Sequence, residues 1–177
     1  MGSIKAILAV AFVVALLGVS LVGWAAANGN DSNSYVLKPE AREELISFVN
    51  EAKDFVLAEG KDKALQVFGD PKGKFTRGEL FINAHDINGT LLTHPYEPEL
   101  IGQNRLNDTD PNGVAFVRIM NDLEKTGGGF SYAIRPNPAH SNAMELKLFY
   151  DLKVNERLWL SSGVYLPGEA PVFQREG

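Results

Sequence analysis

His94 is the residue in this sequence whose position is most suggestive of chemistry, because it lies at the end of a short predicted strand and beside a long polar loop. Its neighbour Pro95 cannot donate to a strand ladder and therefore ends the strand. A histidine at such a place can hydrogen-bond the carboxylate of a small ligand, with a charge that is tunable near neutral pH. Alternatively, its ring fixes the loop through backbone carbonyls. Both roles stay open from the sequence, and so does the imidazole tautomer.

Two further polar residues accompany this loop. Asn83 interrupts an apolar strand, which indicates either a donor in a pocket or a position that faces solvent. Arg105 lies within the loop, and a guanidinium is well suited to bidentate binding of a carboxylate. A charge on the protein surface is the alternative interpretation of Arg105.

Metal and thiol chemistry are not indicated. The chain has no cysteine, which excludes disulfides, thiolate ligands and thiol catalysis, and its three histidines lack the close spacing of metal ligands. Asp108, Asp110 and Asn112 resemble a calcium loop only distantly, and a capped turn is the better interpretation. A nucleophile elbow and a phosphate loop are absent from the sequence, so a hydrolase built on His94 is the weaker hypothesis and no cofactor is predicted.

The composition fits one domain that works outside the cytoplasm. The 177 residues are enough for one hydrophobic core, and a net charge of −5 without a Lys/Arg-rich run argues against nucleic acid as a partner. Lys5 precedes an apolar run, residues 6–24, whose length approaches the roughly 20 residues that span a bilayer. A small-residue stretch like a cleavage site follows it. Residues 1–27 are therefore a cleaved signal peptide or an anchor that holds the membrane through residues 4–24, and residues 28–37 are a linker.

The periodicity of the apolar residues predicts the elements that must position the candidate residues. Three- and four-residue spacing indicates helices, and strict alternation indicates strands. The predicted helices cover residues 39–59, 61–68 and 114–125, and the predicted strands cover 80–84, 91–93, 130–135, 144–154 and 158–165. This order predicts an α+β fold, an antiparallel sheet of about five strands with the long helix on one face. The long loop and the third helix must cover the other face, and a pocket is expected beneath them.

Several short motifs occur in an order and spacing that resemble the extracytoplasmic single Cache domains of chemoreceptors and sensor kinases. They include GKFTRGELFI, a D-x-N-G-T turn, His94-Pro95, Lys147-x-x-Tyr150 and Ser162-Gly163-Val164-Tyr165. The resemblance covers about residues 38–166 and implies a PAS-like sheet with a long N-terminal helix. It also implies a small ligand, often an organic acid, and a signalling protein as partner. No second apolar run precedes Gly177, so we expect a stand-alone Cache protein or a fragment, with residues 167–177 as a tail.

The resemblance also suggests Tyr132, Lys147 and Tyr150 as ligand contacts, because a buried anion needs a cation and hydrogen-bond donors. Lys147 and Tyr150 lie an odd number of residues apart, so a regular strand places them on opposite faces, and a bulge would be needed to bring them together. Arg135 stands where the family often has an aromatic residue, which implies a changed ligand preference, although a surface charge at a hairpin is the alternative.

The resulting hypothesis is a domain that binds a small carboxylate or a similar metabolite for a signalling protein. Dimerisation through the long helix is a further expectation. The alternative is a structural or protein-interaction domain with a degenerate pocket, since fold does not imply function.

Overall fold

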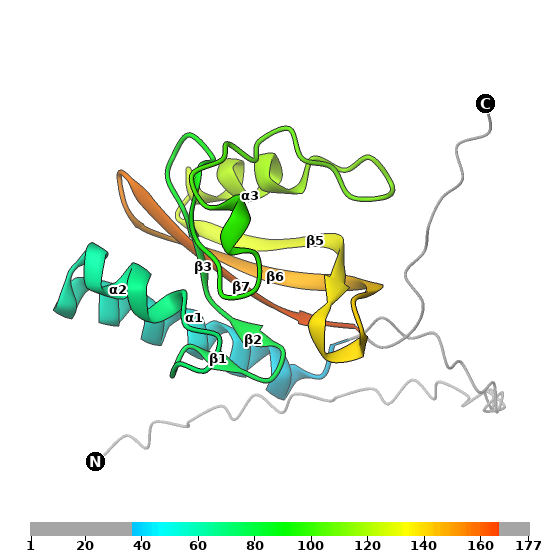
Figure 1. Ribbon diagram of the computed structural model, residues 1–177, viewed down its shortest axis with the longest axis horizontal. Helices are drawn as coiled ribbons and strands as arrows, with labels where there is room; N and C mark the ends of the chain where they lie inside the picture. Colours follow the sequence, from blue (N-terminus) through cyan, green and yellow to red (C-terminus); the bar gives the residue numbers. More distant parts are fainter. Residues whose placement is uncertain (1–36, 167–177) are drawn as a thin grey trace, which may run out of the picture. The chain divides into compact units, whose positions relative to one another are not determined.

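A five-stranded antiparallel sheet lies between two helical layers (Figure 1). The computed structural model describes residues 37–166, so the predicted targeting segment, nearly all of the linker and the tail lie outside the described residues. The predicted α+β fold is confirmed. Its helices are α1 (Pro39–Glu59), α2 (Lys61–Phe68) and α3 (Phe116–Glu124), with short 3-10 turns η1 (Pro98–Leu100) and η2 (Pro138–His140).

The main sheet has the strand order β4-β3-β7-β6-β5. Its last three strands form the predicted meander, in which β6 pairs with both β5 and β7. The strands are β3 (Asn83–His85), β4 (Leu91–Thr93), β5 (Gly128–Asn137), β6 (Ala143–Asn155) and β7 (Leu158–Tyr165). A separate two-stranded ribbon contains β1 (Thr76–Arg77) and β2 (Leu80–Phe81).

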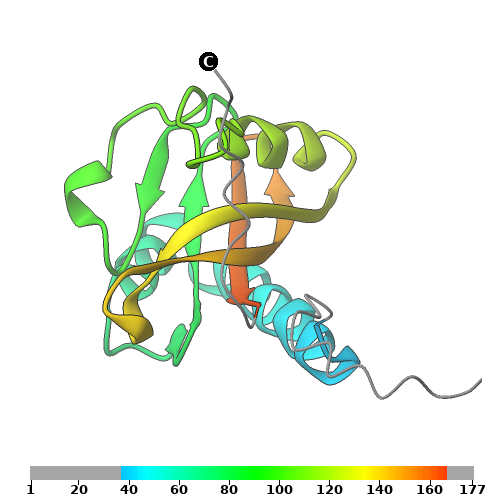
Figure 2. The same ribbon diagram turned by 90° about the vertical axis from the view of Figure 1, so that its right-hand side faces the viewer.

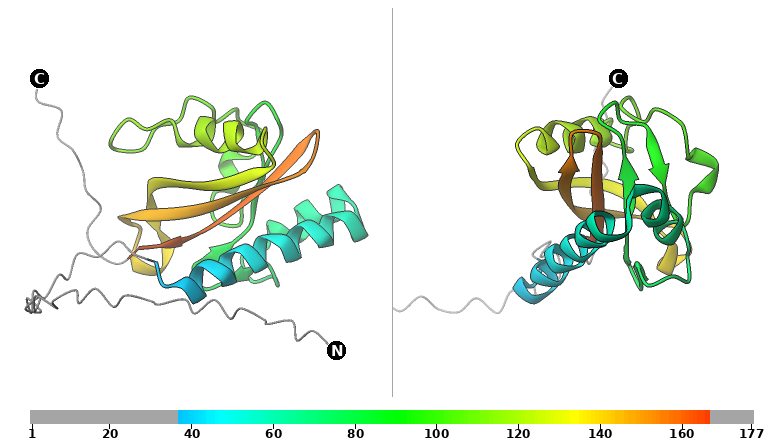
Figure 3. Two further views of the ribbon diagram at one scale, coloured as in Figure 1. Left: turned by 180° about the vertical axis from the view of Figure 1, so that it is seen from behind. Right: turned by 90° about the vertical axis from the view of Figure 1, so that its left-hand side faces the viewer.

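Helix α1 covers one face of the sheet, as Figure 2 and the left view of Figure 3 show. It begins at Pro39, where a missing N–H does no harm, and ends before Gly60, which has a positive φ of 83°. Its apolar stripe packs against β6 and β7. Phe75, which lies between α2 and β1, contacts three other rings of this core, those of Phe48, Phe55 and Phe68. This face of the sheet is therefore closed mainly by apolar and aromatic side chains.

Helix α3 and the loop that follows β4 lie over the opposite face (Figures 1 and 3). Successive side chains of a strand point to opposite faces, and β6 follows this rule. Tyr150 and Leu152 belong to the core beneath α1, whereas Phe149 belongs to a second apolar cluster beneath α3. Lys147 and Asp151 are each two residues from Phe149 along β6, so these two ionisable side chains point to the α3 side.

The predicted strand over residues 80–84 is divided in two. Its first part is β2 of the small ribbon, and its second part, β3, joins the main sheet between β4 and β7. Ile82 stands between them and is fully buried in the core beneath α1. Asn83 and His85 therefore face the α3 side of the sheet. Among residues 37–166, no helix has both the length and the apolar character that a bilayer crossing requires.

Candidate ligand-binding site

A cavity of about 410 Å³ lies between the sheet and its cover of α3 and the long loop. This volume falls within the usual range for small-molecule sites. Strands β3, β6 and β7 contribute residues to its wall, as do α3 and the β5–β6 connection. Its apolar side is formed by Phe81, Leu91, Phe116, Val117, Met120 and Phe149. Five of the seven predicted site residues line it, namely Asn83, His94, Arg105, Arg135 and Lys147.

Lys147 is only 1% exposed, and its ammonium lies among aromatic rings. Its Nζ is 3.9 Å from the ring centroid of Phe81, 4.5 Å from that of Tyr165 and 5.4 Å from that of Phe149. No hydrogen bond or ion pair joins it to another residue of the part that the structure describes. Burial lowers the pKa of Lys147 to about 7, and the positive charge of Arg135 contributes to this lowering, whereas the carboxylates of Glu79 and Glu97 oppose it. The cavity thus contains an ammonium group that has cation–π contacts but no carboxylate in direct contact with it.

The ring of His94 is fixed by the backbone of its own loop. Its Nδ1 accepts hydrogen bonds from the N–H groups of Tyr96, at 3.2 Å, and Glu97, at 3.0 Å. The proton of the neutral ring is therefore on Nε2. Burial lowers the pKa of His94 to about 3, which corrects the expectation of a charge that changes near neutral pH. The loop-fixing role exists, but backbone amides and not carbonyls are the partners.

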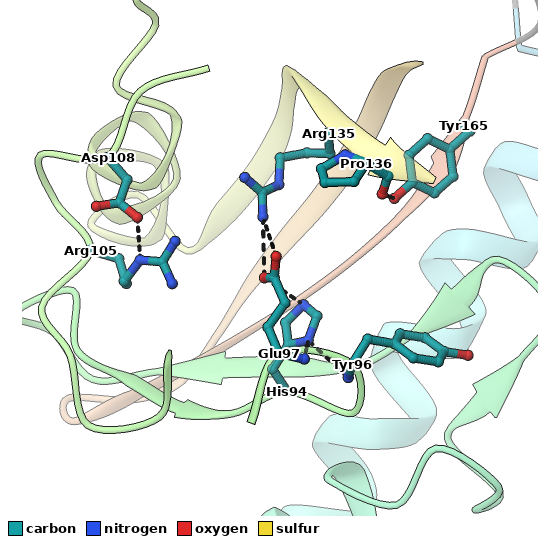
Figure 4. A network of polar contacts seen from close by, with 8 residues as sticks. All are labelled: His94, Tyr96, Glu97, Arg105, Asp108, Arg135, Pro136 and Tyr165. Carbon is teal, nitrogen blue, oxygen red and sulfur yellow. Dashed lines mark hydrogen bonds and ion pairs between the residues drawn. The ribbon is translucent and has the colours of Figure 1, made fainter. Parts of the chain in front are cut away.

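Arg135 belongs to the cavity and is not a surface charge. Its Nη2 contacts both carboxylate oxygens of Glu97, at 3.0 and 3.1 Å, as Figure 4 shows. Its guanidinium also lies 4.8 Å from the ring centroid of Phe116. The ion pair connects the end of β5 to the loop after β4, so Arg135 both holds the cover and presents charge to the cavity.

Arg105 also lies in the cavity wall, and its Nε contacts the carboxylate of Asp108. Near it on β3 are Asn83 and His85, both buried and both facing the cavity. The ring of His85 stacks on Trp159, with centroids 4.4 Å apart and an interplanar angle of 9°. Burial, together with the charge of Arg105, lowers the pKa of His85 to about 3. His85 is therefore a neutral polar group at neutral pH.

Tyr132 and Tyr150 do not line the cavity. Tyr132 is 53% exposed. Tyr150 packs against Phe130 on the α1 side, with ring centroids 5.0 Å apart. Side chains of β6 alternate between the two faces of the sheet, so Tyr150 and Lys147, which are three residues apart, point to opposite faces. The register of β6 with β7 shifts only after Lys153, so no bulge lies between these two residues. The geometry therefore removes these two tyrosines from the proposed site.

Two residues that sequence reasoning did not select take their place. Tyr165 pairs with Lys147 across β6 and β7, and its hydroxyl donates to the carbonyl of Pro136 at 2.5 Å. Burial raises the pKa of Tyr165, so it stays a neutral donor. Glu97 is the partner of Arg135. The alternation of side chains along β7 could have indicated that Tyr165 faces the cavity, whereas no local sequence pattern marks Glu97.

A glycine creates the space for the lysine stem. A Cβ at Gly163 would lie 2.5 Å from the carbonyl oxygen of Leu148 and 2.8 Å from Cε of Lys147. Both distances are shorter than real Cβ contacts allow. A side chain at this position would therefore displace Lys147 from its place in the cavity.

Asp151 is a second buried ionisable group on the α3 side, outside the cavity. Its carboxylate accepts hydrogen bonds from Ser131, at 2.8 Å, and Ser161, at 2.6 Å. Burial raises the pKa of Asp151 to about 7, and the two serines oppose this shift. The layer beneath α3 is thus polar beyond the cavity itself.

A capped turn lies in the loop that precedes α3. Asp110 forms the predicted capped turn, since its Oδ1 accepts from the N–H groups of Asn112 and Val114, both at 2.9 Å. Within residues 37–166, no group of three or more His, Asp or Glu side chains is placed to hold a metal ion.

The comparison with known families agrees with this geometry. Residues 44–167 match the family described as single Cache domain 2. The chain belongs to this family. The match covers α1 from its second turn to the end of β7, and so includes every residue of the cavity in the Cache domain.

Solved structures show the same fold. A methyl-accepting chemotaxis protein from Vibrio parahaemolyticus RIMD 2210633 is 24% identical, with a TM-score of 0.63, and the match covers 71% of this chain and 88% of that one. A periplasmic sensor domain of a chemotaxis protein is 19% identical, with a TM-score of 0.56 and coverage of 72% and 92%. A Cache chemosensory domain described for its carboxylic acid recognition is 19% identical, with a TM-score of 0.54 and coverage of 72% and 90%. A search of curated proteins found no match.

Proposed function

We propose that this Cache domain is an extracytoplasmic sensor domain that binds a small carboxylate in the cavity beneath α3. The observation that carries the proposal is the buried ammonium of Lys147, which lines the cavity without a hydrogen bond or direct ion pair to any described residue. A charge that is desolvated in this way gains strongly from an anionic partner. A carboxylate of a ligand supplies the missing charge.

Groups around Lys147 supply the remaining contacts. Arg135 uses Nη2 for Glu97, which leaves its other terminal nitrogen for the ligand. His94 holds its proton on Nε2, because Nδ1 is occupied by two backbone N–H groups, and Nε2 lies 3.5 Å from Oε2 of Glu97, so the ligand shares this donor with Glu97. Two charged donors and one neutral donor suit a carboxylate, whose two oxygens accept several hydrogen bonds. The recognition of carboxylic acid by one structural neighbour supports the same chemistry.

The signalling role rests on the family and on the sequence that precedes the domain. Membership in the single Cache domain 2 family and the likeness to chemotaxis sensor domains support a place in signal transduction. The apolar run at residues 6–24 supports export or anchoring, with the domain outside the cytoplasm. We propose further that the bound state is passed to a signalling protein and that α1 provides the contact between two copies.

Calorimetry on the full 177-residue chain in mild detergent tests the proposal. The probes are acetate, propionate, pyruvate and lactate, with the matching amides as uncharged controls. We expect one carboxylate per chain to bind and the amides to fail. The variant Lys147→Met should lose at least about tenfold in affinity, the usual scale for a lost charged hydrogen bond. Lys153→Met is the matched control, because Lys153 is on the same strand and pairs with Glu156 away from the cavity.

The pH dependence gives an independent readout. The free protein has a Lys147 pKa of about 7, and a bound carboxylate stabilises the charged form, so binding takes up protons above that pH. Affinity should therefore fall as pH rises above 7, by up to about tenfold per unit. A flat profile would show that Lys147 does not contact the bound acid, and no binding by any acid would support a structural domain with a degenerate pocket.

A further inference from the structure

The geometry points to a ligand with two carboxylates, the second of which is bound by a subsite formed by Asn83, His85 and Arg105. This inference rests on the proposed function, since Lys147 and Arg135 bind the first carboxylate. It adds a second binding position to the same cavity and narrows the ligand class to dicarboxylates.

The subsite contains buried polar atoms that lack partners. Asn83 is 7% exposed and His85 is 5% exposed. Neither side chain forms a hydrogen bond with a residue in the described range 37–166, and Asn83 Oδ1 and His85 Nδ1 are fully buried without partners. Such orphaned groups are rare and destabilising, so each indicates a missing partner. Two of them side by side in one cavity wall indicate a ligand group.

These side chains are held in place. His85 stacks on Trp159, whose Nε1–H donates to the carbonyl of Asp86 at 3.0 Å. The strand positions of Asn83 and His85 are fixed by pairing with Ser161 and Trp159 on β7. A ligand therefore meets groups that are already oriented, which reduces the entropy cost of binding.

Arg105 supplies the charge. Its Nε edge is occupied by Asp108, and Figure 4 shows its other two nitrogens directed away from Asp108 toward the centre of the site. A guanidinium edge of this kind binds a carboxylate bidentately. The orphaned atom of Asn83 is the acceptor Oδ1, so its amide must turn by 180° about the terminal torsion to present Nδ2–H to a carboxylate, and the neutral His85 ring must carry its proton on Nδ1. Three convergent donors with one positive charge match a carboxylate better than a neutral hydroxyl.

The two cationic positions are separated. Along β7, the partner of Lys147 is Tyr165 and the partner of Asn83 is Ser161, an offset of four residues or about 13 Å of strand. Arg105 acts on the pKa of His85 and Arg135 acts on that of Lys147, and all of these groups act on the pKa of His94, which therefore lies between the two positions. The side chains of Lys147 and Arg105 are long, so the distance between their charged groups is shorter than this distance along the strand. Between them lie apolar side chains of the cavity wall, namely Phe116, Met120 and Phe149, so the middle of the ligand is a short carbon chain.

Pairs of acids that differ by one carboxylate test the inference in the full chain. The probes are butyrate against succinate, valerate against glutarate and caproate against adipate, each measured by calorimetry. At least one dicarboxylate should bind about tenfold or more tightly than its partner, as a second charged contact implies. Succinamate, which replaces one carboxylate by an amide, should lose most of that gain.

Two variants separate the subsites. His85→Phe keeps the stacking on Trp159, and Arg105→Met keeps the length of the stem. Each should weaken the dicarboxylate about tenfold and the monocarboxylate clearly less, whereas Lys147→Met weakens both. Arg118→Met is the matched control, because Arg118 is exposed on α3 and bonds Asn107 outside the cavity. Unfolding midpoints of all variants establish that they fold.

The outcomes distinguish this inference from the proposed function. Equal affinities within every pair, or variants of Arg105 and His85 that affect both acids alike, overturn the second subsite and leave monocarboxylate sensing intact. Failure of every acid to bind overturns both. A preference for the dicarboxylates that vanishes in Arg105→Met and His85→Phe supports the inference.

Discussion

The two faces of the sheet use the same strands for opposite purposes. On the α1 face, the large fully buried side chains are hydrocarbon or aromatic, including Leu45, Ile82 and Phe75. The buried polar side chains on this face, among the described residues, are small hydroxyl residues, Thr93 and Ser162. On the α3 face, burial includes a lysine, an aspartate and a histidine, namely Lys147, Asp151 and His85. Strand β6 supplies residues to both faces in strict alternation. One face is closed by apolar packing, and the other is the face that we propose for binding.

The difference shows how the fold tolerates its cavity. Burying an unpaired lysine or a carboxylate near neutral pH is destabilising, because each group is desolvated. The α1 face offsets this cost with close ring contacts, of which Phe68 and Phe75 meet at 4.8 Å and 89°. Substitutions on the two faces should therefore affect stability and binding in different ways, and three predictions follow that division.

The largest effect is expected for Phe75→Ala on the α1 face. Phe75 is fully buried and contacts the rings of Phe48, Phe55 and Phe68. Its truncation leaves a cavity and should lower the free energy of unfolding by about 3–5 kcal/mol. Urea denaturation measures the loss. Leu57→Ala is the control, since Leu57 is 63% exposed on α1 and should change stability by less than about 0.5 kcal/mol. A loss for Phe75→Ala as small as that of the control would mean that the α1 face is not the stabilising one.

The α1 face could be predicted from the sequence because its signal is periodic and local. The helix over residues 39–59 agrees with α1 in both bounds, since its stripe, its proline and its terminal glycine all act within a few residues. The alternation of residues 144–154 likewise predicted β6 and assigned Lys147 and Tyr150 to opposite faces. What local pattern did not predict was the division of residues 80–84 into β2 and β3, which is decided by pairing with distant strands.

The cavity was only partly predictable for a related reason. His94, Arg135 and Lys147 could be selected by residue type and by resemblance. Their contacts depend on which distant segments of the chain pack together, and local sequence patterns do not reveal this. Glu97 reaches Arg135 across 38 positions of sequence. Tyr132 was selected as a donor, yet an edge strand leaves it exposed. Contacts between residues that are far apart in sequence could therefore not be predicted from the sequence.

An intermediate effect is expected for Lys147→Met on the α3 face. The pKa of Lys147 is about 7 in the folded chain against 10.5 for an ordinary lysine, so the unfolded chain binds more protons between these values. The stability of the wild type should rise with pH across that window, and the variant should lack this rise. At pH 7 the variant should be about 1–3 kcal/mol more stable than the wild type. Removal of the desolvated charge is stabilising, and loss of the cation–π contacts offsets part of that gain.

Urea denaturation at pH 7 and pH 9 checks both statements. Lys153→Met again serves as the control, because Lys153 is in contact with solvent and its pKa is raised by Glu156. It should leave the pH profile between 7 and 9 unchanged. If Lys147→Met instead destabilised the domain at both pH values, the ammonium would be a stabilising part of the core, and the contrast between the two faces would not hold.

The smallest effect is expected for Glu97→Gln, which acts on the cover of the cavity. Glu97 and Arg135 are both partly exposed, so loss of their ion pair should cost less than about 1 kcal/mol of stability. The ligand carboxylate competes with Glu97 for the guanidinium, so removal of the charge should raise carboxylate affinity by about two- to fivefold. Calorimetry measures the change, and Glu99→Gln, an exposed glutamate on η1, is the control. A fall in affinity would show that Glu97 positions Arg135 for the ligand and does not compete with it, and the cover would then belong to the binding site as much as the sheet does.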